Sequence, residues 1–178
     1  MKYQKGITLI EVMISILIVA LGLLGMAGLA TSAIKYSKMA SFQSTASRMV
    51  EDYSERMRAN VSGVGVDFYS QAKKYTGRSV PAAIPSCSIP GDCTSQEIAA
   101  IDLAEWNNEL IRSLPAGGAW VQQSNDNNFA YDIWIFWIDP DINFGDGELN
   151  LRAGCPEEML DLGDGDVIPN CIYQKVVI

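Results

Sequence analysis

The chain has 178 residues, of which 48% are hydrophobic and 19% are charged, and 13 basic against 21 acidic residues give a formal net charge of −8. This composition suits one compact domain with an appendage and disfavours an intrinsically disordered chain. The acidic balance disfavours nucleic acid as a partner, because phosphate backbones repel negative charge. Histidine is absent, which excludes Ser-His-Asp and Cys-His nucleophiles and disfavours a catalytic zinc or haem site.

An almost uncharged run, residues 7–34, follows a short basic start that contains Lys2 and Lys5. Glu11 is the only charged residue of the run. Because about 20 consecutive apolar residues cross a hydrocarbon core of about 30 Å, we expect a membrane-spanning helix here. The two lysines favour a cytoplasmic N-terminus, so the residues after 35 would lie on the opposite side of the membrane.

An ordinary cleaved signal peptide is a competing interpretation of this run, with a cleavage site at Ala27-Gly28-Leu29-Ala30. The run is longer than the roughly 7–15 apolar residues of such a peptide. Glu11 lies near its beginning, and a carboxylate at the bilayer centre costs about 2.5–3.5 kcal/mol or more. Glu11 therefore requires a functional explanation.

The sequence Lys5-Gly6-Ile7-Thr8-Leu9-Ile10-Glu11-Val12 resembles the leader junction of type IV prepilins and type II secretion pseudopilins. The resemblance implies that a prepilin peptidase cleaves after Gly6 and N-methylates Ile7. It also implies that Glu11, at the fifth position of the mature chain, contacts the N-terminal amine of a neighbouring subunit. Cleavage and assembly would be chemically linked, because only removal of the leader creates the amine of Ile7.

Residues 20–29 and, less closely, residues 103–118 resemble the PilV minor pilins of type IV pili. The resemblance implies a non-enzymatic subunit without a cofactor, which primes pilus assembly within a minor-pilin complex at or near the filament tip. Such a subunit supports piliation, twitching motility and adhesion. The implied partners are the prepilin peptidase, other minor pilins, the major pilin, the inner membrane and the pilus assembly platform, with no nucleic acid.

The same resemblance implies a single-pass protein of the inner membrane, with a cytoplasmic N-terminus and a periplasmic C-terminal domain, which later enters the extracellular pilus. Two alternatives stay open. One is a minor pseudopilin of a type II secretion system, which shares the N-terminal chemistry. The other is a membrane-anchored periplasmic enzyme or receptor.

Apolar residues continue at helical spacing beyond the run, which predicts one helix from about residue 7 to residue 60. Spacings of three and four residues place on one stripe Met39, Phe42, Ala46, Met49, Val50, Tyr53 and Met57. We expect this stripe to pack on the protein's own sheet. The predicted division is a cleaved leader (1–6), a transmembrane half of the helix (7–34), an amphipathic half (35–60) and a globular domain (61–178).

The globular domain reads as an α+β structure. Residues 61–65 end the long helix, and residues 61–93 are rich in Gly, Ser and Pro, which predicts mostly loop. Thr94-Ser95-Gln96-Glu97 is a capping-box sequence before a short helix that Pro115 ends. Strands are predicted at 119–123, 129–138, 148–153 and 171–177, and the second, apolar on both faces, suits a central strand covered on both sides. A long helix on an antiparallel sheet is the type IV pilin fold that the resemblance implies.

All four cysteines, Cys87, Cys93, Cys155 and Cys171, follow the apolar run, where an even number in an oxidising compartment favours disulfides. Three pairings are possible, and we favour Cys87–Cys93 and Cys155–Cys171 because each closes a loop-rich stretch. The second pair is similar to the C-terminal disulfide loop of pilins. A four-cysteine zinc site is disfavoured, because the spacings lack the short C-x₂₋₄-C pattern.

Two acidic stretches, 139–143 and 161–166, are candidate calcium loops. In the first, Phe144 stands at the sixth position, where the loop needs Gly, and Asn150 at the twelfth, where it needs Glu. The second has no recognised pattern of ligands. The sequence therefore predicts no metal site.

Overall fold

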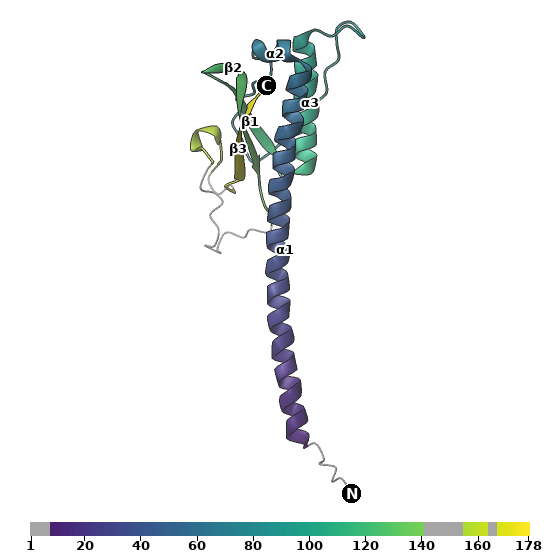
Figure 1. Ribbon diagram of the computed structural model, residues 1–178, viewed down its shortest axis with the longest axis vertical. Coiled ribbons are helices and arrows are strands. Elements are labelled where there is room, and N and C mark those ends of the chain that lie inside the picture. Colours follow the sequence, from purple (N-terminus) through teal and green to yellow (C-terminus); the bar gives the residue numbers. More distant parts are fainter. Residues whose placement is uncertain (1–7, 141–154, 164–166) are drawn as a thin grey trace. The chain divides into compact units, whose positions relative to one another are not determined.

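The computed structural model describes residues 8–140, 155–163 and 167–178. The chain divides into two compact units, Met1–Ala40 and Ser41–Ile178. The helices and strands follow one another in the order α1 (Leu9–Ala59), α2 (Val61–Gly65), α3 (Ser95–Ser113), β1 (Gly118–Ser124), β2 (Asn127–Trp137), a short 3₁₀ helix (Glu157–Met159) and β3 (Asn170–Val177) (Figure 1).

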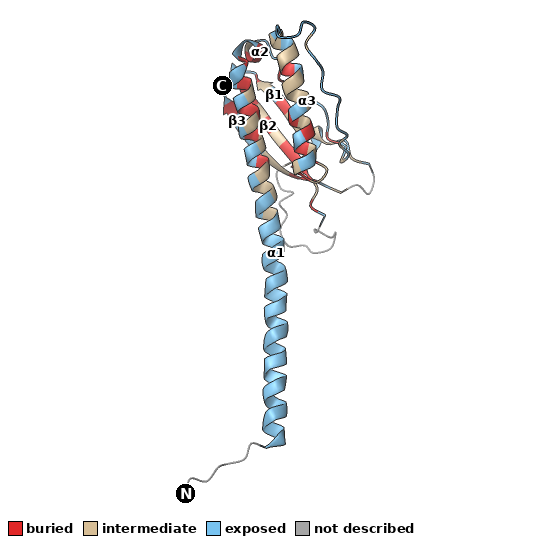
Figure 2. Ribbon diagram, turned by 90° about the vertical axis from the view of Figure 1, so that its right-hand side faces the viewer, coloured by how far each residue is buried: buried red, intermediate tan, exposed pale blue. Residues whose placement is uncertain are grey.

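The part of α1 that lies in the first unit buries none of its apolar side chains, as Figure 2 shows. Leu9 is 82% exposed and Leu29 is 74% exposed. An 18-residue window of this helix has a mean hydropathy of 2.6, so by length and composition it is a candidate membrane span. Exposed apolar surface of this extent is unfavourable in water, and it requires lipid or other helices around it.

The second unit consists of two layers, a sheet and the helices on one of its faces (Figure 1). The three strands are antiparallel in the order β1-β2-β3. The last part of α1 and α3 cover one face, and the core contains the alternating residues Tyr131, Ile133, Ile135 and Trp137 of β2. The predicted α+β class is therefore confirmed.

Six of the seven residues of the predicted stripe of α1 belong to the core or pack against it, and Met39 does not. Ala46, Val50, Tyr53 and Met57 have no exposed surface, and Phe42 and Met49 pack against the same core. Burying one side chain of this size contributes roughly 1.5–3 kcal/mol. The charged residues between them face outward or enter the polar network described next.

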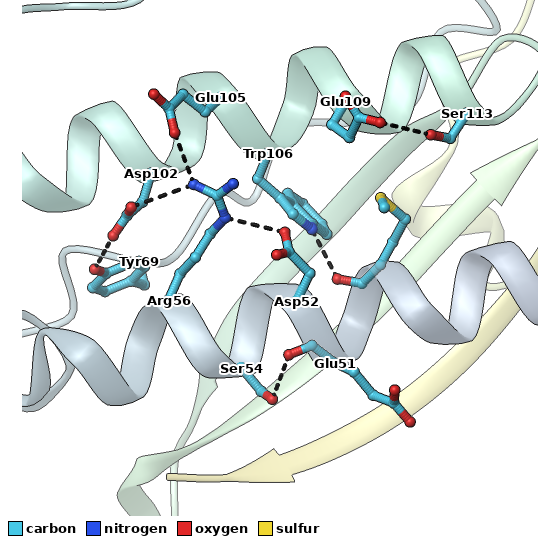
Figure 3. A network of polar contacts seen from close by, with 11 residues as sticks. Glu51, Asp52, Ser54, Arg56, Tyr69, Asp102, Glu105, Trp106, Glu109 and Ser113 are labelled. Atoms are coloured by element: carbon cyan, nitrogen blue, oxygen red, sulfur yellow. Dashed lines mark hydrogen bonds and ion pairs between the residues drawn. The ribbon is translucent and has the colours of Figure 1, made fainter.

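A polar network joins α1 to α3 at the rim of the core (Figure 3). The guanidinium of Arg56 donates to Asp52 on its own helix at 3.0 Å and to Glu105 of α3 at 3.0 Å, and it lies 3.5 Å from Asp102 of α3. The hydroxyl of Tyr69 donates to the second oxygen of Asp102 at 2.6 Å. Burial and this hydrogen bond raise the pKa of Tyr69, so the phenol remains a donor over the physiological range.

Trp106 fills the space between the two helices beside the network. Its indole lies 4.3 Å from the ring of Tyr53, centroid to centroid, and its Nε1 donates to the backbone oxygen of Met49 at 2.8 Å. An indole that is fully buried needs such a partner, because an unpaired N–H in the core is costly. One side chain of α3 thus packs against the stripe of α1 and also hydrogen-bonds to its backbone.

The second face of β2 is covered less fully than its apolar pattern predicts. Phe136 is buried beneath Tyr75, with the two rings stacked at 5.2 Å. Asp132 and Trp134 on the same face are half-buried, and the ring of Tyr173 on β3 lies 4.8 Å from that of Trp134. The prediction of a strand covered on both sides is therefore correct at one end of β2 and wrong at the other.

The segment after α1 differs from the predicted loop. A single residue, Asn60, separates α1 from α2. Its side chain accepts a hydrogen bond from the N–H of Gly63 at 3.4 Å. The carbonyl of Val64 accepts hydrogen bonds from Tyr131 and Gln123, both at 3.0 Å. Both donors to Val64 come from strands that are distant in the sequence, so the sequence of α2 alone gives no signal for these bonds.

The start of α3 carries the predicted capping box. The N–H of Glu97 donates to the hydroxyl of Thr94 at 3.3 Å, and the carboxylate of Glu97 accepts from the N–H of Thr94 at 2.8 Å. The same carboxylate also accepts from the N–H of Ser88 at 2.8 Å.

The predicted strands at 119–123, 129–138 and 171–177 correspond to β1, β2 and β3, whereas 148–153 lies outside the described residues.

Glu97 generates a prediction for the pH dependence of stability. Hydrogen bonds from Ser88 and Thr94 lower the pKa of Glu97 to about 2. A lowered pKa means that the carboxylate stabilises the fold above the usual pKa of glutamate and loses this effect as the pH falls toward about 2. Glu97→Gln should therefore lower the melting temperature at neutral pH and converge with the wild type near the acid end.

The measurement is thermal denaturation of the full chain in detergent at a series of pH values. Glu109→Gln is the matched control, because Glu109 lies on the same helix and its carboxylate accepts from the hydroxyl of Ser113 rather than from a backbone N–H. Parallel curves for wild type and Glu97→Gln down to the lowest pH would contradict the proposed role of the capping carboxylate.

Candidate functional site

The N-terminal stretch is the candidate site that the sequence analysis singles out. Gly6 and Ile7, the predicted cleavage and methylation residues, lie outside the described residues. Glu11 lies in the first turn of α1, where its N–H donates to the backbone oxygen of Thr8 at 3.1 Å. A carboxylate in the first turn of a helix interacts favourably with the partial positive charge of the helix N-terminus.

Glu11 differs from the serine and threonine side chains further along the apolar stretch in lacking a partner. The hydroxyls of Ser15, Thr31 and Ser32 each donate to the backbone oxygen four residues earlier, at 2.7, 3.0 and 3.3 Å. These groups are satisfied within the helix and need nothing from outside. Within the described part of the chain, the carboxylate of Glu11 has no hydrogen-bond or ion-pair partner. An ionised carboxylate in an apolar medium is costly without a counter-charge, so a cation from another molecule would stabilise it there.

The cysteines form two disulfides, and their pairing is the one that the sequence favours. Cys87 is bonded to Cys93 with a Cα–Cα distance of 5.2 Å, and Cys155 to Cys171 with 5.7 Å. Both distances are ordinary for disulfides. The first closes the loop before α3, and the second ties the segment at 155–163 to the beginning of β3.

Two side chains of α3 bind residues 82–88, which are part of the segment between α2 and α3. Glu97 accepts from the N–H of Ser88, and the buried amide of Asn108 pairs with both the N–H and the carbonyl of Ala82, at 2.8 Å each. The capping-box sequence gives a signal for Glu97. An asparagine within a helix gives none, so the sequence analysis missed Asn108.

A groove of about 670 Å³ lies between α1 and α3 beside the polar network, and it is the second candidate site. Its charged lining comprises Arg48, Asp52, Arg56, Glu105, Glu109 and Arg112. Arg56 is already paired with three carboxylates and Arg112 lies 4.0 Å from Glu109, so the charges of the groove neutralise one another. We interpret this groove as part of the contact between the helices.

Metal-ligating chemistry is not concentrated anywhere in the described residues. No group of three or more Asp, Glu, His or Cys side chains within them is arranged to hold a metal ion. The candidate calcium loop at 139–143 lies mostly outside the described residues, as does the second half of the stretch at 161–166. The structure therefore leaves both loops untested.

Comparison with known proteins bears on the N-terminal stretch alone. The family model of the prokaryotic N-terminal methylation motif matches residues 1–27. This match supports a type IV pilin or pseudopilin. It implies processing by a prepilin peptidase and assembly with other pilins, and it suggests a structural subunit rather than an enzyme. Neither a curated protein nor a solved structure matches the chain.

The motif and the apolar half of α1 together fit a membrane-anchored pilin. The matched residues include Gly6, Ile7 and Glu11, so the predicted cleavage site and the unpaired carboxylate belong to one recognised sequence feature. The match ends before the second unit begins, so it carries no information about the role of the globular part.

The two disulfides give a prediction on stability. Closing a longer loop removes more entropy from the unfolded chain, which gives about 3.1 kcal/mol for Cys155–Cys171 and about 2.4 kcal/mol for Cys87–Cys93. Replacing both cysteines of the longer loop by serine should therefore destabilise the second unit more than replacing both of the shorter one. Chemical denaturation of the full-length protein in detergent measures the difference, and an inverted order would contradict it.

Proposed function

We propose that this chain is a minor pilin of a type IV pilus, a non-enzymatic subunit that is made in the inner membrane and then enters the filament. The observation that carries the proposal is the methylation motif, with an unpaired carboxylate at the first turn of an apolar helix. In this proposal a prepilin peptidase cleaves between Gly6 and Ile7 and methylates Ile7. The leader is residues 1–6, and residues 7–34 span the membrane.

Glu11 has the assembly role in this proposal. Its carboxylate pairs with the new α-amine of Ile7 on a neighbouring subunit, which supplies the cation that the apolar surroundings require. A pair of opposite charges is strong in such a medium, and breaking it by removing one partner costs about 3–5 kcal/mol. Exposed apolar side chains around α1 then pack against lipid before assembly and against other helices afterwards.

Resemblance beyond the motif favours a minor pilin over a minor pseudopilin of type II secretion. Residues 20–29 and 103–118 are similar to the PilV minor pilins, and these subunits act in a complex that primes assembly at or near the tip. On this proposal the chain supports piliation, twitching motility and adhesion.

A strain in which the gene is deleted should lose surface pili and twitching motility and keep type II secretion. Loss of secretion with intact pili and twitching would instead identify a pseudopilin.

Processing is the first test of the proposal. Mass spectrometry of the mature protein should find an N-methylated Ile7 at the start of a chain of 172 residues, which is 178 minus the six residues of the leader. Gly6→Val should leave the leader attached, because the peptidase accepts a residue without a side chain at this position. A mature terminus near Thr31 would instead indicate an ordinary signal peptide and would overturn the proposal.

Glu11 separates assembly from folding and is the second test. Glu11→Ala should leave the leader cleavable and the second unit folded, because the residue lies outside that unit. Incorporation into sheared pili should fall more than about ten-fold, since an unpaired amine in an apolar medium costs several kcal/mol. Immunoblots of membrane and pilus fractions beside the wild type measure the effect.

Two further variants control for shape and for helix structure. Glu11→Gln keeps the size but loses the charge and should behave like Glu11→Ala, whereas Glu11→Asp keeps the charge and should be milder. Ser15→Ala removes only a hydrogen bond to the backbone of the same turn and should assemble normally. Normal incorporation of both neutral variants at position 11 would show that the subunit does not dock through this carboxylate.

A further inference from the structure

The two edges of the sheet differ in whether another segment of the described chain forms hydrogen bonds with them. At the edge formed by β1, Gln71 pairs with Val121 through two backbone hydrogen bonds, of 2.8 and 3.1 Å. The hydroxyl of Ser70 also accepts the N–H of Gln123 at 2.9 Å. β3 forms the opposite edge, and among the described residues it pairs with β2 alone. Among the described residues, one edge is therefore closed by the chain itself and the other is open.

The register of β3 shows which of its backbone groups are free. The N–H of Ile178 donates to the backbone oxygen of Phe129 at 2.8 Å, and eight consecutive pairs follow without a shift. Hydrogen-bonded pairs alternate along an antiparallel ladder, so the N–H and C=O groups of Tyr173, Lys175 and Val177 point away from β2. Within the described structure these groups have no protein partner.

Devices that normally protect an edge strand are missing from β3. The strand has no proline and no bulge, and its one charged residue is Lys175. The ammonium of Lys175 does not guard the edge, because it donates to the hydroxyl of Ser124 on β1 at 3.0 Å, across the width of the sheet. The hydroxyl of Tyr173 likewise turns inward to Asp132 at 2.7 Å. Such an edge is a ready template for another strand.

A groove beside the open edge provides room for the side chains of an added strand. It has a volume of about 440 Å³ and lies between residues 174–177 of β3 and residues 50–58 of α1. Figure 2 shows β3 on the α1 side of the sheet and β1 on the α3 side. The charged lining of the groove is Glu51, Glu55, Arg58 and Lys175. Arg58 pairs with Glu55, whereas the carboxylate of Glu51 has no ion-pair partner among the described residues, so it is available to a basic side chain of an added strand.

We propose that the β3 edge binds an extended segment of a neighbouring pilus subunit, which adds to the sheet as a fourth strand. The partner's chemistry follows from the edge, because a row of alternating N–H and C=O groups is matched by another strand and by no compact ligand. The naming of a pilus subunit rests on the proposed function. Pairing through this edge would position the globular part of the subunit in its complex.

The charge of the chain indicates that the strand comes from a different subunit rather than from a second copy. Residues 90–178, which include the whole sheet, contain three basic and sixteen acidic residues, a net charge of −13. Two such surfaces repel each other. A partner strand with a lysine or arginine opposite Glu51 avoids this repulsion.

Photocrosslinking in cells tests the edge directly in the full-length chain. Benzoylphenylalanine is placed at Gln174 on the open edge and, as a matched control, at Gln122, an exposed glutamine on the closed edge. After irradiation and shearing, the Gln174 probe should crosslink to a different pilus subunit, identified by mass spectrometry. The Gln122 probe should give at least about ten-fold less of that product, the equivalent of about 1.4 kcal/mol.

Backbone hydrogen bonding is then separated from side-chain contacts by a pair of variants. Lys175→Pro and Lys175→Ala both lose the ammonium, but only proline removes the outward N–H, on the side where an edge strand tolerates it. Crosslinking from Gln174 should fall about ten-fold in Lys175→Pro and change less than about two-fold in Lys175→Ala, because only the first leaves a partner's carbonyl unpaired. If Lys175→Pro does not fold, Val177→Pro and Val177→Ala make the same comparison.

Each other outcome overturns the inference in a distinguishable way. A crosslink to residues 148–153 of the same chain would mean that the chain closes its own edge. A crosslink to a second copy would assign the edge to self-association, and equal crosslinking in the proline and alanine variants would show that no strand pairs there. If the processed protein is found in sheared pili but the Gln174 probe gives no crosslink, the proposal of strand pairing at the β3 edge is wrong and the proposed function stands. If the protein is absent from pili, the proposed function is wrong, and so is the proposal that a pilus subunit binds the edge.

Discussion

The structure depends on where the apolar surface of α1 can be buried. The backbone N–H and C=O groups of a helix bond to one another within the helix. The stability of a helix in a protein therefore depends mainly on what covers its apolar side chains. In the second unit, the residues of one stripe are covered by the sheet and by α3. In the described part of the first unit, apolar residues lie on every side and none is fully buried. The chain therefore has one self-sufficient core and one surface that needs a membrane or other subunits.

Polar groups follow the same division. In the second unit the polar groups between α1 and α3 are paired within the fold, because Arg56 faces three carboxylates and Tyr69 is bonded to one of them. In the first unit the hydroxyls of Ser15, Thr31 and Ser32 bond to their own helix, whereas the carboxylate of Glu11 has no partner among the described residues. A structural core tolerates few unpaired groups. The unpaired carboxylate on the apolar part of α1 is the feature on which the proposed docking between subunits rests.

The sheet carries a second contrast of this kind. Residues 70–71 close the β1 edge. On β3, the side chains of Tyr173 and Lys175 bond to Asp132 and Ser124 of the neighbouring strands and do not cover the edge. The disulfide between Cys155 and Cys171 holds the start of β3 in place. Binding of a partner strand would cost the β3 edge itself little conformational entropy, because the edge is already ordered as a strand. Glu11 and the β3 edge are thus two unsatisfied features on separate units, each suited to a different kind of neighbour.

The sequence by itself determined the features whose causes are local. Apolar spacing marked the stripe of α1, Thr94 and Glu97 marked the start of α3, and the leader motif marked Gly6, Ile7 and Glu11. Spacing favoured the two cysteine pairs, because each closes a short loop. The tertiary structure alone decided the turn at α2, the amide of Asn108 on Ala82, the partial cover of β2 and the open edge of β3. Each of these depends on groups that are far apart in the chain, and no residue type or spacing records which strand has a neighbour on its outer side.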